Sequence, residues 1–308
     1  MKFGKLADIS GVDFSLPPDP PANGRFWTEL PRDPGGRMTV YTGCTGWSMA
    51  EWVGKWYPAG TKSKSFLTAY GRQFNTIELN TTHYRIPAAT TIEQWTMSVP
   101  RDFRFCPKIP QRISHDGNLG LPGDQLPLFW EALARFGDQL GACFLQLPPY
   151  FDTSRREILD HFLQQWPREF PLAVELRHPS WFASAEQVDN LARLLYLHGA
   201  GALITGVAGR RDVLHLLVTA PFAMVRFVGN GLDPTDYERI DQWCRHLGDW
   251  QAKGLRTVFF FPHEPDNLLA PELTAYFSAQ LQQQAGIHTR GPAPVNSPEP
   301  GGEQMSLF

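Results

Sequence analysis

Short apolar runs alternate with longer amphipathic stretches through most of this chain. The apolar runs predict strands at residues 38–44, 76–80, 103–108, 142–147, 172–177, 201–205, 222–228 and 256–261. Helical periodicity follows near residues 61–73, 90–98, 125–139, 154–166, 184–198, 235–253 and 266–284. The connection after the sixth strand carries the weakest helical pattern. Because strands alternate with helices, the pattern predicts an α/β protein with parallel strand pairing.

The number of strand–helix units indicates the architecture. Eight such units within about 250 residues are typical of a closed (β/α)8 barrel. We therefore predict a single TIM barrel over residues 38–286. A doubly wound open sheet is the alternative, but no GxGxxG motif follows the first predicted strand.

The two ends of the chain differ from the middle. Residues 1–37 hold six prolines and are predicted to form an extended N-terminal arm. Residues 287–308 are predicted to be a flexible tail, because they are rich in Pro, Gly and Ser up to the terminal peptide QMSLF.

Composition limits the class of protein. The hydrophobic fraction of 42% is that of a globular chain, and 28 basic against 31 acidic residues disfavour a broad electrostatic grip on nucleic acid. We find no run near the roughly 20 apolar residues of a membrane helix, and no apolar core of a secretory signal at the start. Cys44, Cys106, Cys143 and Cys244 form no CxxC pair and are expected to be buried thiols. We expect a cytoplasmic protein without a membrane partner.

Side-chain alternation along the predicted strands places polar groups inside the barrel. Apolar residues at alternate positions suit the side that faces the helices, which leaves the polar residues facing inward. The inward polar residues at the carboxyl ends of five strands are Glu78, Asn80, Lys108, Gln146, Glu175, Arg177 and Arg226. Barrel enzymes keep their active sites at that end, so we predict a functional site there. A packed plug of ion pairs is the alternative, since isolated buried charges are costly.

Aromatic and histidine side chains follow the same strand ends. A single loop aromatic is typical of packing, but several around one rim suggest a stacking platform for a sugar or a base. Trp47, Tyr84 and Trp181 are therefore added to the predicted substrate-binding residues, beside Asn80, Gln146, Arg177 and Arg226.

Several motifs in the right order carry a family resemblance. They are GCTGW (43–47), WYP (56–58), FNTIELNTTHY (74–84), FRFCPKIPQRISH (103–115), LQLPP (145–149), AVELRHPSW (173–181) and VRF (225–227). Together they resemble the YecE-like TIM-barrel family, a domain-of-unknown-function family, number 72. The resemblance implies a TIM barrel and no established reaction. This chain departs from the family pattern at Val228, and again at FFPHEPDN (260–267), where His263 or Asn267 could compensate.

The leading hypothesis is an enzyme, with hydrolase as the candidate class, that acts on an anionic small molecule or nucleotide by acid–base chemistry. The anion, phosphorylated or carboxylated, would be held by Lys108, Arg177 and Arg226, since guanidinium groups match paired oxygens. The candidate catalytic groups are Glu78 and Glu175, paired as general base and general acid, with Lys108 or His178 as the alternative proton donor. Clustering with cations would lower the pKa of both glutamates, which suits a base better than an acid.

Three other chemistries stay open or are set aside. A glycosidase would use the paired carboxylates and the aromatics. We predict no metal and no cofactor, because no HExxH or comparable spacing is present. A non-catalytic ligand-binding barrel would keep Glu78 and Glu175 permanently ion-paired beneath a closed mouth.

The last five residues suggest a protein partner. Gln304, Leu307 and Phe308 resemble the QxSLF peptide by which bacterial DNA-maintenance proteins bind the sliding clamp. An exposed Leu–Phe pair on a tether favours a hydrophobic pocket in a partner, although it could also dock on its own barrel. The barrel would then be a nucleic-acid repair or processing factor.

Overall fold

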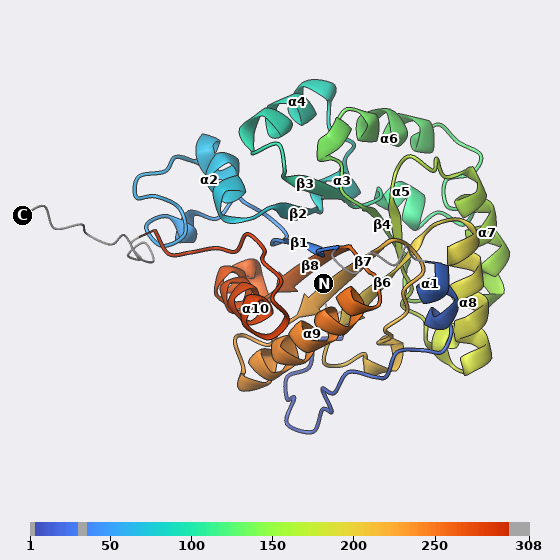
Figure 1. The fold of residues 1–308 in the computed structure, drawn as a ribbon. Coiled ribbons are helices and arrows are strands. Elements are labelled where there is room, and N and C mark those ends of the chain that lie inside the picture. The colour runs from blue at the N-terminus through green and yellow to red at the C-terminus, as the bar shows by residue number, and fades with distance from the viewer. Residues whose placement is uncertain (1–3, 30–35, 296–308) are drawn as a thin grey trace, which may run out of the picture.

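The computed structural model describes residues 4–29 and 36–295, and it shows an α/β fold built on parallel strands (Figure 1). Within these residues the strands are β1 (Thr39–Thr42), β2 (Thr76–Leu79), β3 (Arg104–Pro107), β4 (Cys143–Gln146), β5 (Leu172–Glu175), β6 (Gly201–Gly206), β7 (Phe222–Val228) and β8 (Thr257–His263). Each begins and ends within two residues of a predicted strand. The alternation of apolar runs thus identified the strands.

Helices lie around the outside of the strands (Figure 1). The longer ones are α2 (Phe66–Gln73), α4 (Ala89–Ser98), α6 (Gln125–Ala134), α7 (Arg156–Gln165), α8 (Ala185–Leu197), α9 (Pro234–Ala252) and α10 (Ala270–Ala285). They match the predicted helical stretches. The turns α3 (Thr81–Tyr84) and α5 (Gln111–Ser114) are too short for a 3.6-residue period to reveal.

Short 3-10 turns complete the connections. They are η1 (Ala50–Trp52), η2 (Ser63–Ser65), η3 (Gly137–Gln139), η4 (Thr153–Arg155), η5 (Pro179–Phe182), η6 (Arg211–Val213) and η7 (Pro265–Asn267). In the part of the chain that the structure describes, we find no helix with the length and apolar character needed to span a membrane.

The strands pair in parallel, but the sheet is not closed. β1, β8, β7, β6, β5 and β4 form one ladder in that order, and β2 pairs with β3 in a separate ladder. The predicted α/β class is confirmed, whereas a continuous barrel ladder is not observed. Breaks lie at two seams, between β1 and β2 and between β3 and β4.

Side chains replace the ladder at the seam between β1 and β2. The side chain of Asn75 accepts a hydrogen bond from the Thr42 N–H at 2.7 Å and donates one to the Val40 carbonyl at 3.0 Å. The Tyr70 hydroxyl accepts from the Cys44 N–H at 2.7 Å. One main-chain hydrogen bond, from the Glu78 N–H to the Cys44 carbonyl at 3.1 Å, also crosses this seam, so the side-chain bridges supplement it where a regular ladder is absent.

An extra residue interrupts the seam between β3 and β4. Isolated bridges join Phe105 to Leu140 and Lys108 to Phe144. On the β3 side the two bridged positions are three residues apart, but on the β4 side they are four residues apart. The β4 side therefore carries one additional residue. A bulge of this kind breaks the regular pairing.

A central apolar cluster fills the space between the strands. It contains Cys106, Phe144, Ala173, Met224 and Phe261, all of them buried. The residues at the alternate positions of these strands belong instead to other apolar clusters, which also contain residues of the helices. Polar residues further along the inward side therefore stand directly after this cluster. All four cysteines are free and buried, as expected.

The predicted N-terminal arm is only partly extended. A helix, α1 (Asn23–Glu29), interrupts it and buries Phe26. The Asn23 side chain donates to the Leu216 carbonyl at 2.8 Å and accepts from the Val218 N–H at 2.9 Å. The prolines predicted extension but gave no indication of this docking.

The predicted flexible tail needs a correction up to residue 295. Thr289 is buried, and its hydroxyl donates to the Val40 carbonyl at 2.6 Å. The Gln73 side chain exchanges hydrogen bonds with the backbone of Ala293 at 2.9 and 3.1 Å. The segment 287–295 therefore belongs to the folded body. The predicted partner-binding residues Gln304, Leu307 and Phe308 lie outside the described residues.

Candidate active site at the strand ends

Polar side chains from six strands meet at the carboxyl ends of the strands, where alternation predicted them. We call this group the strand-end cluster; it consists of Glu78, Asn80, Lys108, Gln146, Glu175, Arg177, Arg226 and His263. Hydrogen bonds link all of its members into one network. The prediction of convergence is therefore confirmed for its seven sequence-derived members.

Arg226 stands at the centre of the network. Its Nε and Nη2 atoms donate to the two carboxylate oxygens of Glu78 at 2.9 and 3.0 Å. Its Nη1 atom donates to Oε2 of Glu175 at 2.8 Å. The guanidinium carbon lies 5.8 Å from the ring centroid of Phe144 below it. One buried arginine thus holds both buried carboxylates, in the fork geometry that only guanidinium provides.

The second carboxylate leads to Lys108. Glu175 accepts from Nε of Arg177 at 2.6 Å and from the Gln146 amide at 2.9 Å. The oxygen of the Gln146 side chain in turn accepts from Nζ of Lys108 at 2.8 Å. Gln146 therefore orients the ammonium group, while Glu175 orients the guanidinium group of Arg177.

Glu78 has two further partners on the opposite side. The Asn80 amide donates to Oε1 at 2.9 Å, and Nε2 of His263 lies 2.8 Å from Oε2. A carboxylate only accepts, so His263 carries its proton on Nε2. This histidine comes from the segment in which the sequence departs from the family pattern.

Charges inside the network keep both carboxyl groups ionised. Burial raises the pKa of Glu78, but Arg226 and His263 lower it to well below its usual range. Burial likewise opposes ionisation of Glu175, and Arg177 with Arg226 outweighs it, so the pKa of Glu175 falls to about 2. Neither group holds a proton to donate near neutral pH. The predicted general-acid role therefore does not suit Glu78 or Glu175.

These shifts predict a loss of stability in acid. A carboxyl group whose pKa is lower in the folded chain than in the unfolded chain stabilises the folded state at pH values above its ordinary pKa of 4.5. This contribution to stability is lost as the pH falls toward about 2. Glu175→Gln removes one such group. Below pH 4.5, the slope of unfolding free energy against pH should then decrease by the equivalent of up to one proton. Urea unfolding at a series of pH values measures both slopes, and equal slopes would contradict the prediction.

Basic groups gather on one side of the network. We call His83, Lys108, His115 and Arg177 the basic face. Burial lowers the pKa of each, and repulsion from neighbouring cations lowers it further. The pKa of Lys108 falls to about 8 and that of His83 to about 4. An anion among these groups would reverse the repulsion, so the basic face is an electrostatic fit for a negatively charged ligand.

A cavity of about 510 Å³ opens beside the network. Arg177, Arg226 and His263 line it, together with Thr205 at the end of β6 and Glu264 after β8. The cluster therefore borders accessible space, unlike a sealed plug. Its carboxylates are nevertheless ion-paired, which the plug alternative also predicted.

Four predicted site residues lie outside the network: Trp181, Tyr84, Trp47 and His178. The Trp181 ring is buried against Phe151, 6.4 Å between centroids, and its N–H donates to the Phe151 carbonyl at 2.8 Å. Trp181 is therefore a core residue, because its loop folds back on the preceding one. Tyr84 is 80% exposed and stands apart from the cluster. The proposed stacking platform does not form from these two rings.

Trp47 and His178 also have local roles. Trp47 is half-buried and packs edge-on against Trp95 at 5.6 Å. Nδ1 of His178 accepts from the Ser180 N–H at 3.2 Å and so caps η5. Among the described residues we find no group of three or more His, Cys, Asp or Glu side chains placed to hold a metal ion.

Sequence reasoning missed Glu264. Its side chain is buried in the wall of the cavity, Oε2 accepts from the Gly231 N–H at 2.7 Å, and Oε1 has no hydrogen-bond partner among the described residues. Burial raises its pKa to about 7. A β-carbon at Gly229 would lie 2.1 Å from Oε1, so that glycine makes room for the carboxyl group. The sequence indicated this residue only through its position in FFPHEPDN (260–267), a segment in which the chain departs from the family pattern.

Comparison with known proteins gives consistent relatives. A family model described as "Protein of unknown function DUF72" matches residues 41–298. "UPF0759 protein YecE" of Escherichia coli is 32% identical over 252 residues, which cover 76% of this chain and 89% of that protein. "UPF0759 protein YunF" of Bacillus subtilis is 27% identical over 151 residues, or 47% of this chain and 52% of that protein.

Solved structures are similar in fold. A DUF72 family protein from Enterococcus faecalis has a TM-score of 0.61 at 19% identity, with 85% of this chain and 99% of that chain covered. One from Thermotoga maritima has a TM-score of 0.59 at 23% identity, with 80% and 98% covered. At these identities the likeness shows the fold and carries no information on a ligand.

Proposed function

The chain belongs to the DUF72 family of proteins of unknown function, and on that premise we propose that its strand-end cluster is the active site of an enzyme for an anionic small molecule. The substrate class is a phosphorylated or carboxylated small molecule, nucleotides included, and the chemistry is proton transfer. The proposal treats the fold as a (β/α)8 barrel with two irregular seams, so that the cluster stands at its carboxyl-end mouth.

The observation that carries the proposal is the charge arrangement of the basic face. Glu78 and Glu175 supply two negative charges against the three positive charges of Lys108, Arg177 and Arg226. Both carboxylates pair with Arg226, and Glu175 also pairs with Arg177. Lys108 hydrogen-bonds to a neutral amide, and the histidines of the basic face add no negative charge. A phosphate or carboxylate group between Lys108 and Arg177 supplies the missing charge.

Lys108 is the proposed proton carrier. With a pKa of about 8 it exchanges a proton near neutral pH, as a general acid or base requires. Glu175 and Gln146 then position Arg177 and Lys108 and do not themselves exchange protons. Lys108 thus takes the proton-transfer role that the paired glutamates were predicted to have. A glycosidase is disfavoured because Glu175 stays ionised and has no proton to donate to a leaving group.

A non-catalytic ligand-binding barrel is the second candidate. The ion pairing of Glu78 and Glu175 with Arg226 favours it, since a structural network needs no reacting group. Both candidates bind the anion, and only the enzyme also converts it. A protein that binds phosphorylated compounds but converts none from a broad set would support this second candidate.

Anion binding is tested directly with inorganic phosphate and adenosine monophosphate. Lys108→Met is expected to weaken binding about tenfold to a hundredfold, the loss of one charge-assisted hydrogen bond of about 1.5–3 kcal/mol. Bound phosphate should also raise the pKa of His115, because it offsets the repulsion from Lys108 and Arg177. Calorimetry measures the affinity and NMR titration measures the pKa.

The matched control is Lys64→Met, a change at an exposed lysine in η2. It should leave both readouts unchanged. Absence of phosphate and nucleotide binding by the unaltered protein, or equal affinity in Lys108→Met, would overturn the anion site.

A further inference from the structure

The first residues that the structure describes lie at the mouth of the candidate site. Gly4, Lys5 and Leu6 line the same cavity of about 510 Å³ as Arg177 and Arg226. We call residues 4–17 the strap. In Figure 1 this stretch, in dark blue, loops out from the strands before it reaches α1. The strap precedes residue 41, where the match to the family model begins.

Two glycines hold the first part of the strap close to the barrel. The Gly4 carbonyl accepts from the Gly209 N–H at 2.8 Å, and Gly4 adopts a φ of 70° that favours glycine. A β-carbon on Gly4 would lie 2.8 Å from Cγ1 of Val207. A β-carbon on Gly209 would lie 2.9 Å from the Gly4 carbonyl oxygen and 3.0 Å from Leu6. The contact therefore depends on the absence of side chains on both surfaces.

The far end of the strap is held by several side-chain contacts. Phe14 is buried with the Arg239 guanidinium 4.8 Å from its ring centroid, and the Ser15 carbonyl accepts from Arg211 at 2.6 Å. Just beyond it, Asp19 pairs at 2.6 Å with Lys253, which directly follows α9. These contacts do not depend on the Gly4 end.

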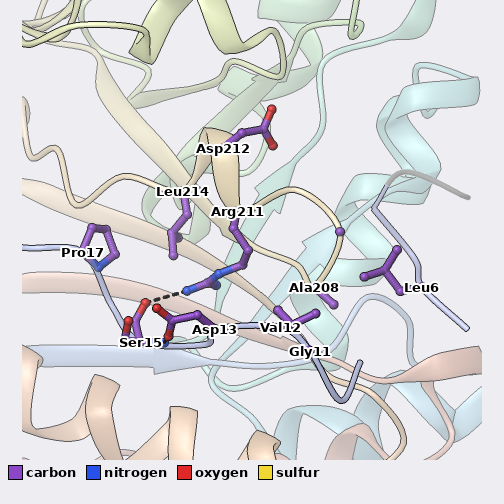
Figure 2. A pocket seen from close by; sticks show the side chains of 11 residues that line it. Leu6, Gly11, Val12, Asp13, Ser15, Pro17, Ala208, Arg211, Asp212 and Leu214 are labelled. Carbon is purple, nitrogen blue, oxygen red and sulfur yellow. Dashed lines mark hydrogen bonds between the residues drawn. The ribbon is translucent and has the colours of Figure 1, made fainter. Parts of the chain in front are cut away.

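The middle of the strap spans open space. A cavity of about 690 Å³ lies between the strap and the connection from β6 to β7. Figure 2 shows the side chains that line it. Gly11, Val12 and Asp13 line it from the strap, and Arg211 and Asp212 from the barrel. A segment anchored at both ends but poorly supported between them is well suited to lift at its weaker end.

We propose that the strap roofs the mouth and restricts the site to small molecules, excluding a nucleic-acid strand or other polymer. This inference rests on the proposed function, because it takes the strand-end cluster as the substrate site. A cavity of about 510 Å³ falls within the roughly 300–1,000 Å³ of small-molecule pockets. A polymer needs an open groove along which its backbone continues, and the strap crosses that path.

The test lifts the strap in the full chain and compares two ligands. Gly4→Ala and Gly209→Ala each place a β-carbon in the tight contact, and Gly11→Ala is the control because a β-carbon there meets nothing within 4 Å. Faster tryptic cleavage after Lys5 reports lifting. We expect the two contact variants to bind a short single-stranded oligodeoxynucleotide at least tenfold more tightly than the unaltered protein and Gly11→Ala. Their affinity for adenosine monophosphate should change much less.

A deletion of residues 1–12 keeps the Phe14 and Asp19 anchors and serves as the second variant. Equal oligonucleotide affinity with and without residues 1–12, in a protein that binds adenosine monophosphate, would overturn the strap proposal and leave the anion site standing. Tight oligonucleotide binding by the unaltered protein would overturn it as well. Failure of every variant and of the unaltered protein to bind adenosine monophosphate and phosphate would instead remove the proposed function, and the strap proposal with it.

Discussion

Replacing Arg226 with methionine is expected to lower the free energy of unfolding by about 3–5 kcal/mol. That is a large share of the roughly 5–15 kcal/mol that keeps a domain folded. Methionine retains much of the apolar stem above Phe144 but removes the guanidinium group that Glu78 and Glu175 share. Both carboxylates would stay buried with one fewer cation. The loss thus comes from uncompensated buried charge more than from lost packing.

The two carboxylates should respond unequally. Glu175 keeps Arg177 and the Gln146 amide, whereas Glu78 keeps only His263 and the Asn80 amide of its observed partners. Adding Glu78→Gln to Arg226→Met should therefore restore part of the lost stability, since it removes the less compensated charge. Simple loss of packing would not be rescued this way.

Urea unfolding of the single and double variants measures the effect. The control is Arg193→Met, which breaks an exposed pair with Asp189 one turn away on α8 and should cost less than about 1 kcal/mol. A loss at Arg226 no larger than at Arg193 would show that the network does not depend on its central arginine.

Seven of the eight members of the strand-end cluster were predictable because alternation is local, and only His263 was not placed there. Glu78, Glu175 and Arg226 each stand between apolar neighbours that face the helices. Five or six residues of sequence are therefore enough to predict on which face of the strand each polar side chain lies. Their partners were not predictable. Which oxygen Arg226 reaches depends on how β2, β5 and β7 are placed around the site, and residues 148 and 51 positions apart carry no mutual signal in one sequence.

Irregular segments escaped prediction for a related reason. Trp181 follows a strand end and so suggested a ligand contact, yet its ring packs on Phe151 thirty positions earlier. The prolines of the N-terminal arm predicted extension correctly for much of its length, but they say nothing of the surface that an extended chain covers. Docking at Gly4 depends on Gly209, which lies in an unrelated loop.

The two open seams show the limit of counting strands. Eight strand–helix units indicate a closed barrel only if each neighbouring pair forms a ladder. Asn75 and Tyr70 replace the ladder at the first seam, and an extra residue interrupts the second. Side-chain bridges and bulges leave no periodic trace, so the pattern predicted the strand order correctly but not the breaks.

The first seam should also be the most sensitive point of the fold to a single added carbon. A β-carbon at Gly43 would lie 1.9 Å from the Thr76 carbonyl oxygen and 2.7 Å from the Tyr70 hydroxyl oxygen. That hydroxyl accepts from the Cys44 N–H and donates to Thr76 at 2.9 Å, so neither neighbour can retreat without losing the bridge. We expect Gly43→Ala to lower the free energy of unfolding by about 3 kcal/mol or more, the upper end of overpacking effects.

Gly46→Ala, three residues along the same loop, is the matched comparison, because a β-carbon there meets nothing within 4 Å. It should change the free energy of unfolding by less than about 0.5 kcal/mol, as surface substitutions usually do. Urea unfolding of both variants separates steric crowding at the seam from a general intolerance of this loop. Similar values for the two would mean that β1 and β2 shift apart at little cost. In that case the side-chain bridges would follow the strand spacing and would not set it.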